Sequence, residues 1–507
     1  MFYSKYISGV AMGAILFTGS LFLSSCEKFV EIDDPVNTIG TEAVFNSDEK
    51  ALSALSGMYS LMINEAEMKA TNGAQSVYGA LLSDEGLFGL NPGLDDLYEL
   101  YNAQILKKNG MVITLWDKPY QVIYAANAIE AGVNNSTSLA LTNTTRKQIL
   151  GEVKLVRAFL YFNLVNTFGE IPLVLTTDVN VNKSMTKSSV AAVNNQIEKD
   201  LKEAFSLLNN DYSHAGGKKL RPNKYAAAAL LARQYLYMQR WDESAAFADT
   251  VINSGKYSLT TVANTFKAEN TEALWQLQNS RIGTVESFEA SFFVPPYRFS
   301  EDPISLGPIY FDLFLFQMSA DFGFIFPLVM ASDQIINSFE KKDLRMKTWM
   351  DSIPTPLEPP YNGKVDRFFF KYNRESALFG TMGNLNNTVL RLAEMYLVRA
   401  EAIAKGSRSL SDAVNDINVI RRRAGLDDIS IGSQQDVLDA IEKERKHELF
   451  AEWSHRWFDV KRWGKADAIF GTLSHKQPWS NHTLVLPIPE SEIMANPRLL
   501  QNPGYTK

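Results

Sequence analysis

Charged and aromatic residues are most concentrated near the C-terminal end of the chain, between residues 444 and 463. Three glutamates recur there at intervals of four, so on one helix they share a face and repel one another unless cations pair with them. We therefore expect a partly buried ion-pair network between 444–453 and 456–462, walled by tryptophans. Its predicted members are Glu444, Arg445, Glu448, Glu452, Arg456, Asp459 and Arg462. Such networks specify geometry more than they add stability, so a structural role is expected, with ligand or partner contact as the alternative.

Catalytic motifs are absent from the sequence. It contains no G-x-S-x-G elbow, no P-loop and no G-x-G-x-x-G after a strand. His447-Glu448 resembles half of a zinc-protease motif, but Ala451 stands where the second histidine is needed. The acidic pairs Asp95-Asp96 and Asp427-Asp428 could serve a surface glycoside hydrolase, although such pairs are common on protein surfaces. We predict neither an enzyme nor a metal or other cofactor site.

Composition indicates a folded protein and disfavours nucleic acid as a partner. Of the 507 residues, 46% are hydrophobic, which is enough to build a large core. The formal net charge is −7, and the basic residues form no cluster of the kind that phosphate-rich partners require.

The N-terminus is typical of an exported lipoprotein. Lys5 precedes an apolar run from residue 7 to 23, which predicts a signal peptide over 1–25. The run ends in Leu23-Ser24-Ser25-Cys26, which fits a lipobox, and Cys26 is the only cysteine of the chain. We expect Cys26 to carry acyl chains such as palmitate that hold the protein on a membrane, followed by a polar tether over 26–46. A chance cysteine after an ordinary signal or short anchor is the alternative.

The body, 47–507, is predicted to be one mainly α domain. Apolar residues at Ile149, Val153, Val156, Leu160 and Leu164 form a helical stripe before a terminating Gly169, and Val389 to Ile403 repeats that spacing before Gly406. Two segments share a Leu-Ala-x-x-Tyr-Leu pattern, 231–236 and 392–397, and each precedes another helix, over 241–252 and 411–423. These αα-hairpins have the length of tetratricopeptide units. Alanine-rich helices in another kind of bundle are the alternative.

An irregular insertion is predicted at about 255–383, where nine prolines interrupt the helical pattern. We expect loops there, with short strands and helices packed on the scaffold. Within it, residues 292–326 contain 11 aromatic side chains but no tryptophan. Aromatic enrichment in irregular structure raises the question of a binding surface, although core packing or a surface that meets a partner protein would explain it too.

Several motifs, in order along nearly the whole mature chain, resemble the SusD/RagB family of Bacteroidetes outer-membrane nutrient-binding lipoproteins. The C-terminal signature is carried by 444–452 and 456–464. Further matches are Trp116 with Tyr120 and Asn127, Arg157 to Tyr161, Phe168 to Pro172, Leu390 to Glu394, Arg399 to Glu401, Arg421 to Gly425, Leu486 to Glu490, Asn496 with its proline, and Gln501 to Tyr505.

The resemblance implies a non-catalytic binding protein at the cell surface. It implies tetratricopeptide-like hairpins with a loop-rich insertion, and a partner in a SusC-like TonB-dependent outer-membrane barrel, to which the protein delivers oligosaccharides. A peptide-binding lid of the same kind of transporter is the alternative, and a scaffold lipoprotein without a small ligand is a third possibility. By region, the implied ligand contacts are Asn91, Asp95, Tyr98, Tyr297, Arg298, Phe299 and Phe324. Flat rings can cover the apolar face of a sugar while polar neighbours bond its hydroxyls.

Overall fold

A computed structural model gives the fold of the chain. The residues it describes are 41–63, 68–88, 94–278, 287–295, 307–322, 326–372 and 386–505. The chain divides into two compact units, residues 1–44 and 45–507. In the first unit the structure describes one helical turn, α2 (Thr41–Val44).

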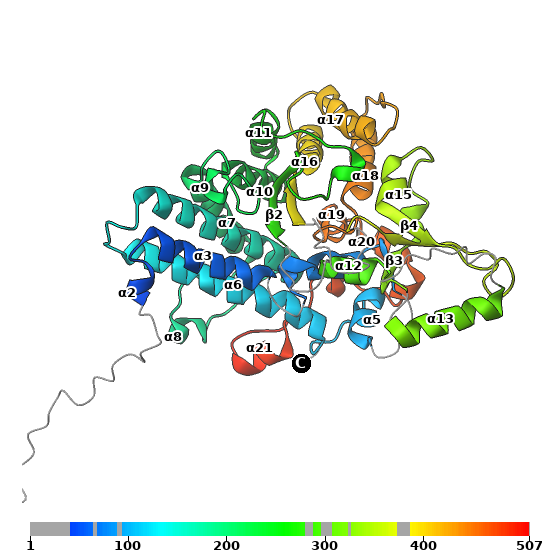
Figure 1. Ribbon diagram of the computed structural model, residues 1–507, viewed down its shortest axis with the longest axis horizontal. Coiled ribbons are helices and arrows are strands. Elements are labelled where there is room, and N and C mark those ends of the chain that lie inside the picture. The colour runs from blue at the N-terminus through cyan, green and yellow to red at the C-terminus, as the bar shows by residue number, and fades with distance from the viewer. Residues whose placement is uncertain are drawn as a thin grey trace, which may run out of the picture. The chain divides into compact units, whose positions relative to one another are not determined.

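Long helices form a scaffold in which successive members pack against one another, in the order α6, α7, α9, α10, α11, α16 and α17, with α3 against α6 and α18 against α16 and α17 (Figure 1). The protein is mainly α, as predicted. These helices are α3 (Asp48–Ile63), α6 (Gly110–Asn135), α7 (Asn143–Phe168), α9 (Val190–Leu207), α10 (Lys224–Tyr237), α11 (Trp241–Ile252), α16 (Leu392–Lys405), α17 (Leu410–Arg423) and α18 (Gln434–Leu449).

The remaining helices of the second unit lie around this scaffold. They are α4 (Ala74–Leu82), α5 (Asp95–Asn102), α8 (Val179–Asn182), α12 (Phe288–Phe293), α13 (Pro308–Phe322), α14 (Asp333–Ile336), α15 (Leu344–Trp349), α19 (His455–Arg462), α20 (Ala466–Ile469) and α21 (Glu490–Ala495). Single 3-10 turns lie at Ala70–Asn72, Ser213–Ala215, Val262–Asn264, Phe470–Thr472, Ser474–Lys476 and Asn481–Leu484.

Helix α7 shows how sequence and packing set the scaffold. The Thr142 side chain accepts a hydrogen bond from the Thr145 amide and caps the N-terminus, and Gly169, with φ of 73°, ends the helix as predicted. The predicted apolar stripe is buried, but the polar face is buried too, including Glu152 and Arg157. The reason is that α6 packs on one side and α9 on the other, so α7 lies at the centre of the scaffold and its charges must find partners inside the protein.

The two predicted αα-hairpins are present as α10 with α11 and α16 with α17. Ala226 to Ala229 have no solvent exposure, so α10 packs closely on its neighbours. Asn223 caps α10, because its side chain accepts hydrogen bonds from the amides of residues 225 and 226. One boundary differs from the prediction. Val389 belongs to a strand rather than to α16, because it pairs across a sheet before the helix begins.

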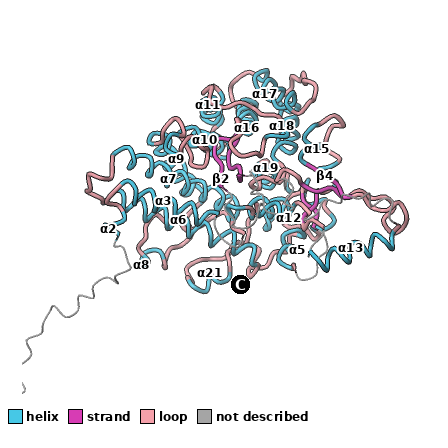
Figure 2. The backbone as a smooth tube through the Cα atoms, in the orientation of Figure 1, coloured by secondary structure: helices cyan, strands magenta, loops and turns pink. Residues whose placement is uncertain are grey.

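Two small antiparallel sheets lie within or beside the insertion (Figure 2). Strands β2 (Ala273–Gln278) and β6 (Asn386–Arg391) pair with each other, so the two ends of the segment between them are held together. The second sheet has the order β1-β3-β5-β4, with strands β1 (Gly86–Phe88), β3 (Val329–Ala331), β4 (Met350–Ile353) and β5 (Asp366–Phe369).

The insertion is less irregular than the prolines suggested. Helix α13 runs for 15 residues and begins at Pro308, the position at which proline is tolerated in a helix. Its aromatic residues divide between core and surface: Phe311 is buried, whereas Tyr310 is 69% exposed. Tyr361 holds the helix through its ring, which lies 5.1 Å from Phe311, and through its hydroxyl, which donates to Asp312. Across the described residues, no helix has both the length and the apolar character needed to cross a bilayer.

Candidate functional site

The structure describes two of the seven predicted ligand contacts, Asp95 and Tyr98, both on α5. The others, Asn91, Tyr297, Arg298, Phe299 and Phe324, lie outside the described residues, as does Cys26. Asp95 and Tyr98 are three residues apart on one helix, so their side chains share a face. Both are exposed, Tyr98 by 44%. A carboxylate and a phenol ring therefore face solvent together.

Tyr98 belongs to a group of rings that we call the α5 aromatic cluster, made of Phe88, Tyr98, Tyr101 and His475. The rings of Phe88, Tyr98 and Tyr101 lie 6.4 Å from one another. His475 stacks on the far side at 4.0 Å from Tyr101, with an interplanar angle of 1°. The exposed ring of Tyr98 thus rests on a packed base, which limits the side-chain entropy that a ligand must overcome.

The loop that carries His475 is fixed to α4 and α5 by hydrogen bonds. The ammonium of Lys476 is buried and donates to the carbonyls of Leu81 and Tyr101, each at 2.8 Å. Burial lowers the pKa of Lys476 to about 7. Burial, together with the charge of Lys476, lowers the pKa of His475 to about 4. His475 is consequently neutral at physiological pH, and its Nε2 has no hydrogen-bond partner.

Helix α5 is held in place by Asn109, the N-cap of α6. Its side-chain oxygen accepts the amides of Met111 and Val112, and its amide donates to the Asp96 carbonyl at 2.9 Å and to Glu99 at 2.8 Å. One buried side chain therefore starts α6 and positions α5.

Sequence reasoning missed Tyr101, His475 and Trp479 in this region. Tyr101 could have been found, because it lies three residues after Tyr98 on the same helix. His475 and Trp479 could not, because they lie more than 370 residues away in the chain. Trp479 is partly exposed and donates its indole N–H to Asp467 at 2.9 Å.

The predicted ion-pair network is built with different partners from those expected. The three glutamates contact cations from other elements instead of the segment 456–462. Glu444 contacts Arg345 at 2.8 Å, Glu448 contacts Arg391 at 2.5 Å, and Glu452 contacts Lys371 at 2.6 Å. Arg421 and Arg423 add contacts to Glu444 and Glu448. Sequence spacing showed that the glutamates share a face but could not show which distant cations fold against it.

The remaining predicted members pair mainly with further acidic groups. Arg445 contacts Asp459 at 2.6 Å, which is the direct link between the two motif segments. Arg456 contacts Asp84 at 2.7 Å, and Arg462 pairs with Glu401 at 2.6 Å. These side chains are buried or nearly so, and the charges compensate one another. The network joins α15, α16, α17, α18, α19 and β6, and its burial removes most of it from contact with a surface ligand.

The charge balance of the network appears in the pKa of Glu448. Burial alone would raise that pKa, but the positive charges of Arg423, Arg391 and Arg345 outweigh burial and lower it well below its usual range. Within the described part of the chain, no group of three or more His, Cys, Asp or Glu side chains is arranged to hold a metal ion.

Two family models match this chain. Residues 36–236 match the model described as "Starch-binding associating with outer membrane", and residues 361–505 match the model described as "SusD family". The chain belongs to the SusD/RagB family. Neither family model covers residues 237–360, which include most of the predicted insertion.

Relatives of known sequence and structure agree with the SusD assignment. SusD-like protein P2 of Formosa agariphila is 27% identical over 518 residues, which is 96% of this chain and 98% of that protein. A SusD superfamily protein of Bacteroides vulgatus has the same fold, with a TM-score of 0.74 at 22% identity over 91% of this chain and 100% of the other. A structure described as a laminarin-binding SusD-like protein aligns with a TM-score of 0.71 at 23% identity, over 91% and 100%.

Proposed function

We propose that the protein is a non-catalytic, lipid-anchored receptor at the cell surface that binds oligosaccharides and delivers them to a TonB-dependent outer-membrane transporter. The family description, starch binding in association with the outer membrane, supports the ligand class and the location. The laminarin-binding neighbour supports a glycan ligand in the same way. The predicted lipobox at Cys26 supports the anchor, and the SusC-like barrel remains the partner that the family resemblance implies.

The observation that carries the ligand proposal is the exposed ring of Tyr98 on the α5 aromatic cluster. An aromatic face can cover the apolar C–H face of a sugar, while nearby polar groups bond its hydroxyls. Asp95, on the same helix face, offers a carboxylate that accepts such hydrogen bonds. Asn91, Tyr297, Arg298, Phe299 and Phe324 stay predicted contacts of the same ligand.

A calorimetric screen of the chain from Glu27, against a panel of glycans and a panel of peptides, tests this function. We expect a glycan to bind and Tyr98→Ala to weaken the binding about 2- to 12-fold, because an aromatic contact contributes about 0.5–1.5 kcal/mol. Tyr124→Ala is the matched control, since Tyr124 is 48% exposed on α6, outside the cluster. Binding of peptides alone would replace the glycan proposal with the peptide-binding alternative.

The transporter half of the proposal is tested separately by purification from outer membranes. The protein is expected to co-purify with a large barrel protein after mild detergent extraction. Isolation without any barrel, despite intact glycan binding, would contradict delivery to a transporter and leave a surface receptor.

A further inference from the structure

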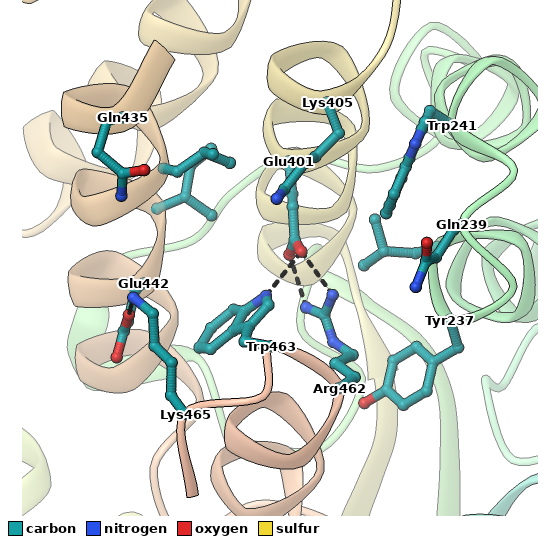
Figure 3. A pocket seen from close by; sticks show the side chains of 13 residues that line it. Tyr237, Gln239, Trp241, Glu401, Lys405, Gln435, Glu442, Arg462, Trp463 and Lys465 are labelled. Atoms are coloured by element: carbon teal, nitrogen blue, oxygen red, sulfur yellow. Dashed lines mark hydrogen bonds and ion pairs between the residues drawn. The ribbon is translucent and has the colours of Figure 1, made fainter. Parts of the chain in front are cut away.

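The eight tryptophans of the chain are distributed unevenly between core and surface. Five are buried: Trp116, Trp275, Trp349, Trp453 and Trp457. Three are partly exposed, and two of these, Trp241 and Trp463, line the same pocket (Figure 3). The indole of tryptophan combines an apolar ring face with one polar N–H edge. Two partly exposed indoles in one concave site therefore offer apolar walls that a ligand with an apolar face can cover.

This tryptophan pocket lies where four parts of the scaffold meet. The end of α10, the following turn and the start of α11 supply Tyr237, Gln239 and Trp241, while α16 supplies Glu401 and Lys405. Further walls come from α18, including Gln435, and from the end of α19, including Trp463. The cavity measures about 230 Å³. It shares no residue with the α5 aromatic cluster.

The floor of the tryptophan pocket is rigid because its charges are fully engaged. Arg462 forms a two-pronged ion pair with the buried Glu401, with one contact at 2.6 Å, and the indole N–H of Trp463 donates to the same carboxylate at 2.8 Å (Figure 3). The guanidinium of Arg462 also lies 5.0 Å from the ring of Tyr237 and 4.9 Å from that of Trp463. The ring of Trp463 is thus oriented before any ligand arrives.

The rim of the pocket, in contrast, carries polar groups that are open to solvent. Gln239, Lys405 and Gln435 are exposed, and the Gln435 amide donates one hydrogen bond to Asp439 at 2.8 Å, which leaves its carbonyl oxygen to accept. Lys405 forms no ion pair with any described residue, whereas Lys465 is paired with Glu442. Amide and ammonium groups can donate hydrogen bonds, and the amides can also accept them. An occupant must therefore present an apolar face to the indoles and several hydroxyl-like groups to the rim.

We propose that the tryptophan pocket is a second saccharide site that holds a single sugar ring, at the end of a glycan chain or free. A sugar ring has an apolar C–H face and a hydroxyl-bearing edge, which matches indole walls beneath a polar rim. The cavity is smaller than the about 300–1,000 Å³ of pockets that hold drug-sized ligands, so it encloses one ring, and the rest of a longer chain would lie outside it. The ligand class rests on the proposed glycan-binding function, but the site does not.

Fluorine NMR of the full chain labelled with 5-fluorotryptophan tests the proposal, with each of the eight resonances assigned by a Trp→Phe variant. The probes are D-glucose, D-galactose, D-mannose and N-acetyl-D-glucosamine. We expect at least one of them to shift the Trp241 and Trp463 resonances together, and the five buried tryptophans to stay unchanged. Trp241→Ala should abolish the response at Trp463, and Gln435→Ala should weaken it about tenfold through loss of a hydrogen bond.

Tyr98→Ala separates this site from the α5 aromatic cluster. The response at Trp241 and Trp463 should persist in that variant. A response confined to Trp479 would overturn the second site and leave the proposed function standing. The same conclusion would follow if calorimetry detected glycan binding while Trp241 and Trp463 gave no response. A response at these two residues to peptides but not to sugars would also overturn it. If Trp241→Ala fails to fold, Gln435→Ala and Lys405→Ala decide the question, because both residues are exposed on the rim.

Discussion

Single buried charges decide how this scaffold is held together. Glu448 has no solvent exposure and contacts arginines from α15, β6 and α17. Removing one member of such a buried group leaves cations without compensation in a region of low dielectric constant. Removing Glu448 alone is therefore expected to destabilise the protein by more than the loss of its own contacts.

Glu448→Ala should lower the free energy of unfolding by about 3–5 kcal/mol, the range found when a buried ion pair loses one partner. Denaturant titration of the variant and the parent protein measures the difference. Asp427→Ala is the control, because Asp427 is 93% exposed and lies 3.9 Å from Lys342, and it should change stability by less than about 0.5 kcal/mol. A loss below about 1 kcal/mol for Glu448→Ala would contradict the role given to the network.

Glu85 makes the stability depend on pH. Burial, reinforced by the charge of Asp84, raises its pKa to about 8. Between about pH 4.3 and 8 the unfolded carboxyl is ionised while the folded one keeps its proton, so the folded state binds more protons and stability falls as pH rises. The slope from this group is at most about 1.4 kcal/mol per pH unit.

Glu85→Gln should remove that slope and retain the hydrogen bond that the side chain accepts from the Ala451 amide at 3.1 Å. Unfolding of both proteins across pH 4.5 to 8 tests this. We expect the variant to gain stability relative to the parent as the pH rises. A difference that stays constant with pH would show that Glu85 titrates normally.

Elements were predictable where the local pattern agreed with the packing. Helices α7, α10, α11, α16 and α17 follow from apolar spacing and terminal glycines or caps. The pattern failed where contacts with distant segments determine the secondary structure. Val389 has helical spacing but belongs to β6, which pairs with β2, and Pro308 begins α13 instead of interrupting a helix. The candidate site was predictable only within α5, since His475 reaches Tyr101 from the far end of the chain.

Asn109→Ala tests whether one cap positions two helices. Loss of the cap should cost about 1–2 kcal/mol of stability, and the loss of the bonds to Asp96 and Glu99 should also weaken glycan binding at the α5 aromatic cluster. Ser189→Ala, which removes the cap of α9, should reduce stability without changing affinity. Calorimetry and denaturant titration of both variants measure the two effects. Unchanged affinity in Asn109→Ala would show that α5 is held by packing alone.

At the scale of the whole molecule, the proposed attachment to the membrane depends on one residue, Cys26. Cys26→Ser removes the thiol that would be acylated, and several acyl chains are what make such anchoring durable. We expect the variant to leave the outer-membrane fraction while its soluble body still binds glycans. Fractionation of cells followed by immunoblotting measures the distribution. Retention of Cys26→Ser in the membrane, in the absence of the barrel partner, would contradict lipid anchoring.

The pairing of β2 with β6 has a consequence for how such proteins diversify. Because this ladder closes the segment between residues 278 and 386 at its base, that segment begins and ends at one place on the scaffold. Its length and sequence can change through evolution while the helical hairpins on either side keep their contacts. The fold thus offers an exchangeable cassette, and grafting it between relatives should transfer whatever specificity it carries without rebuilding the scaffold.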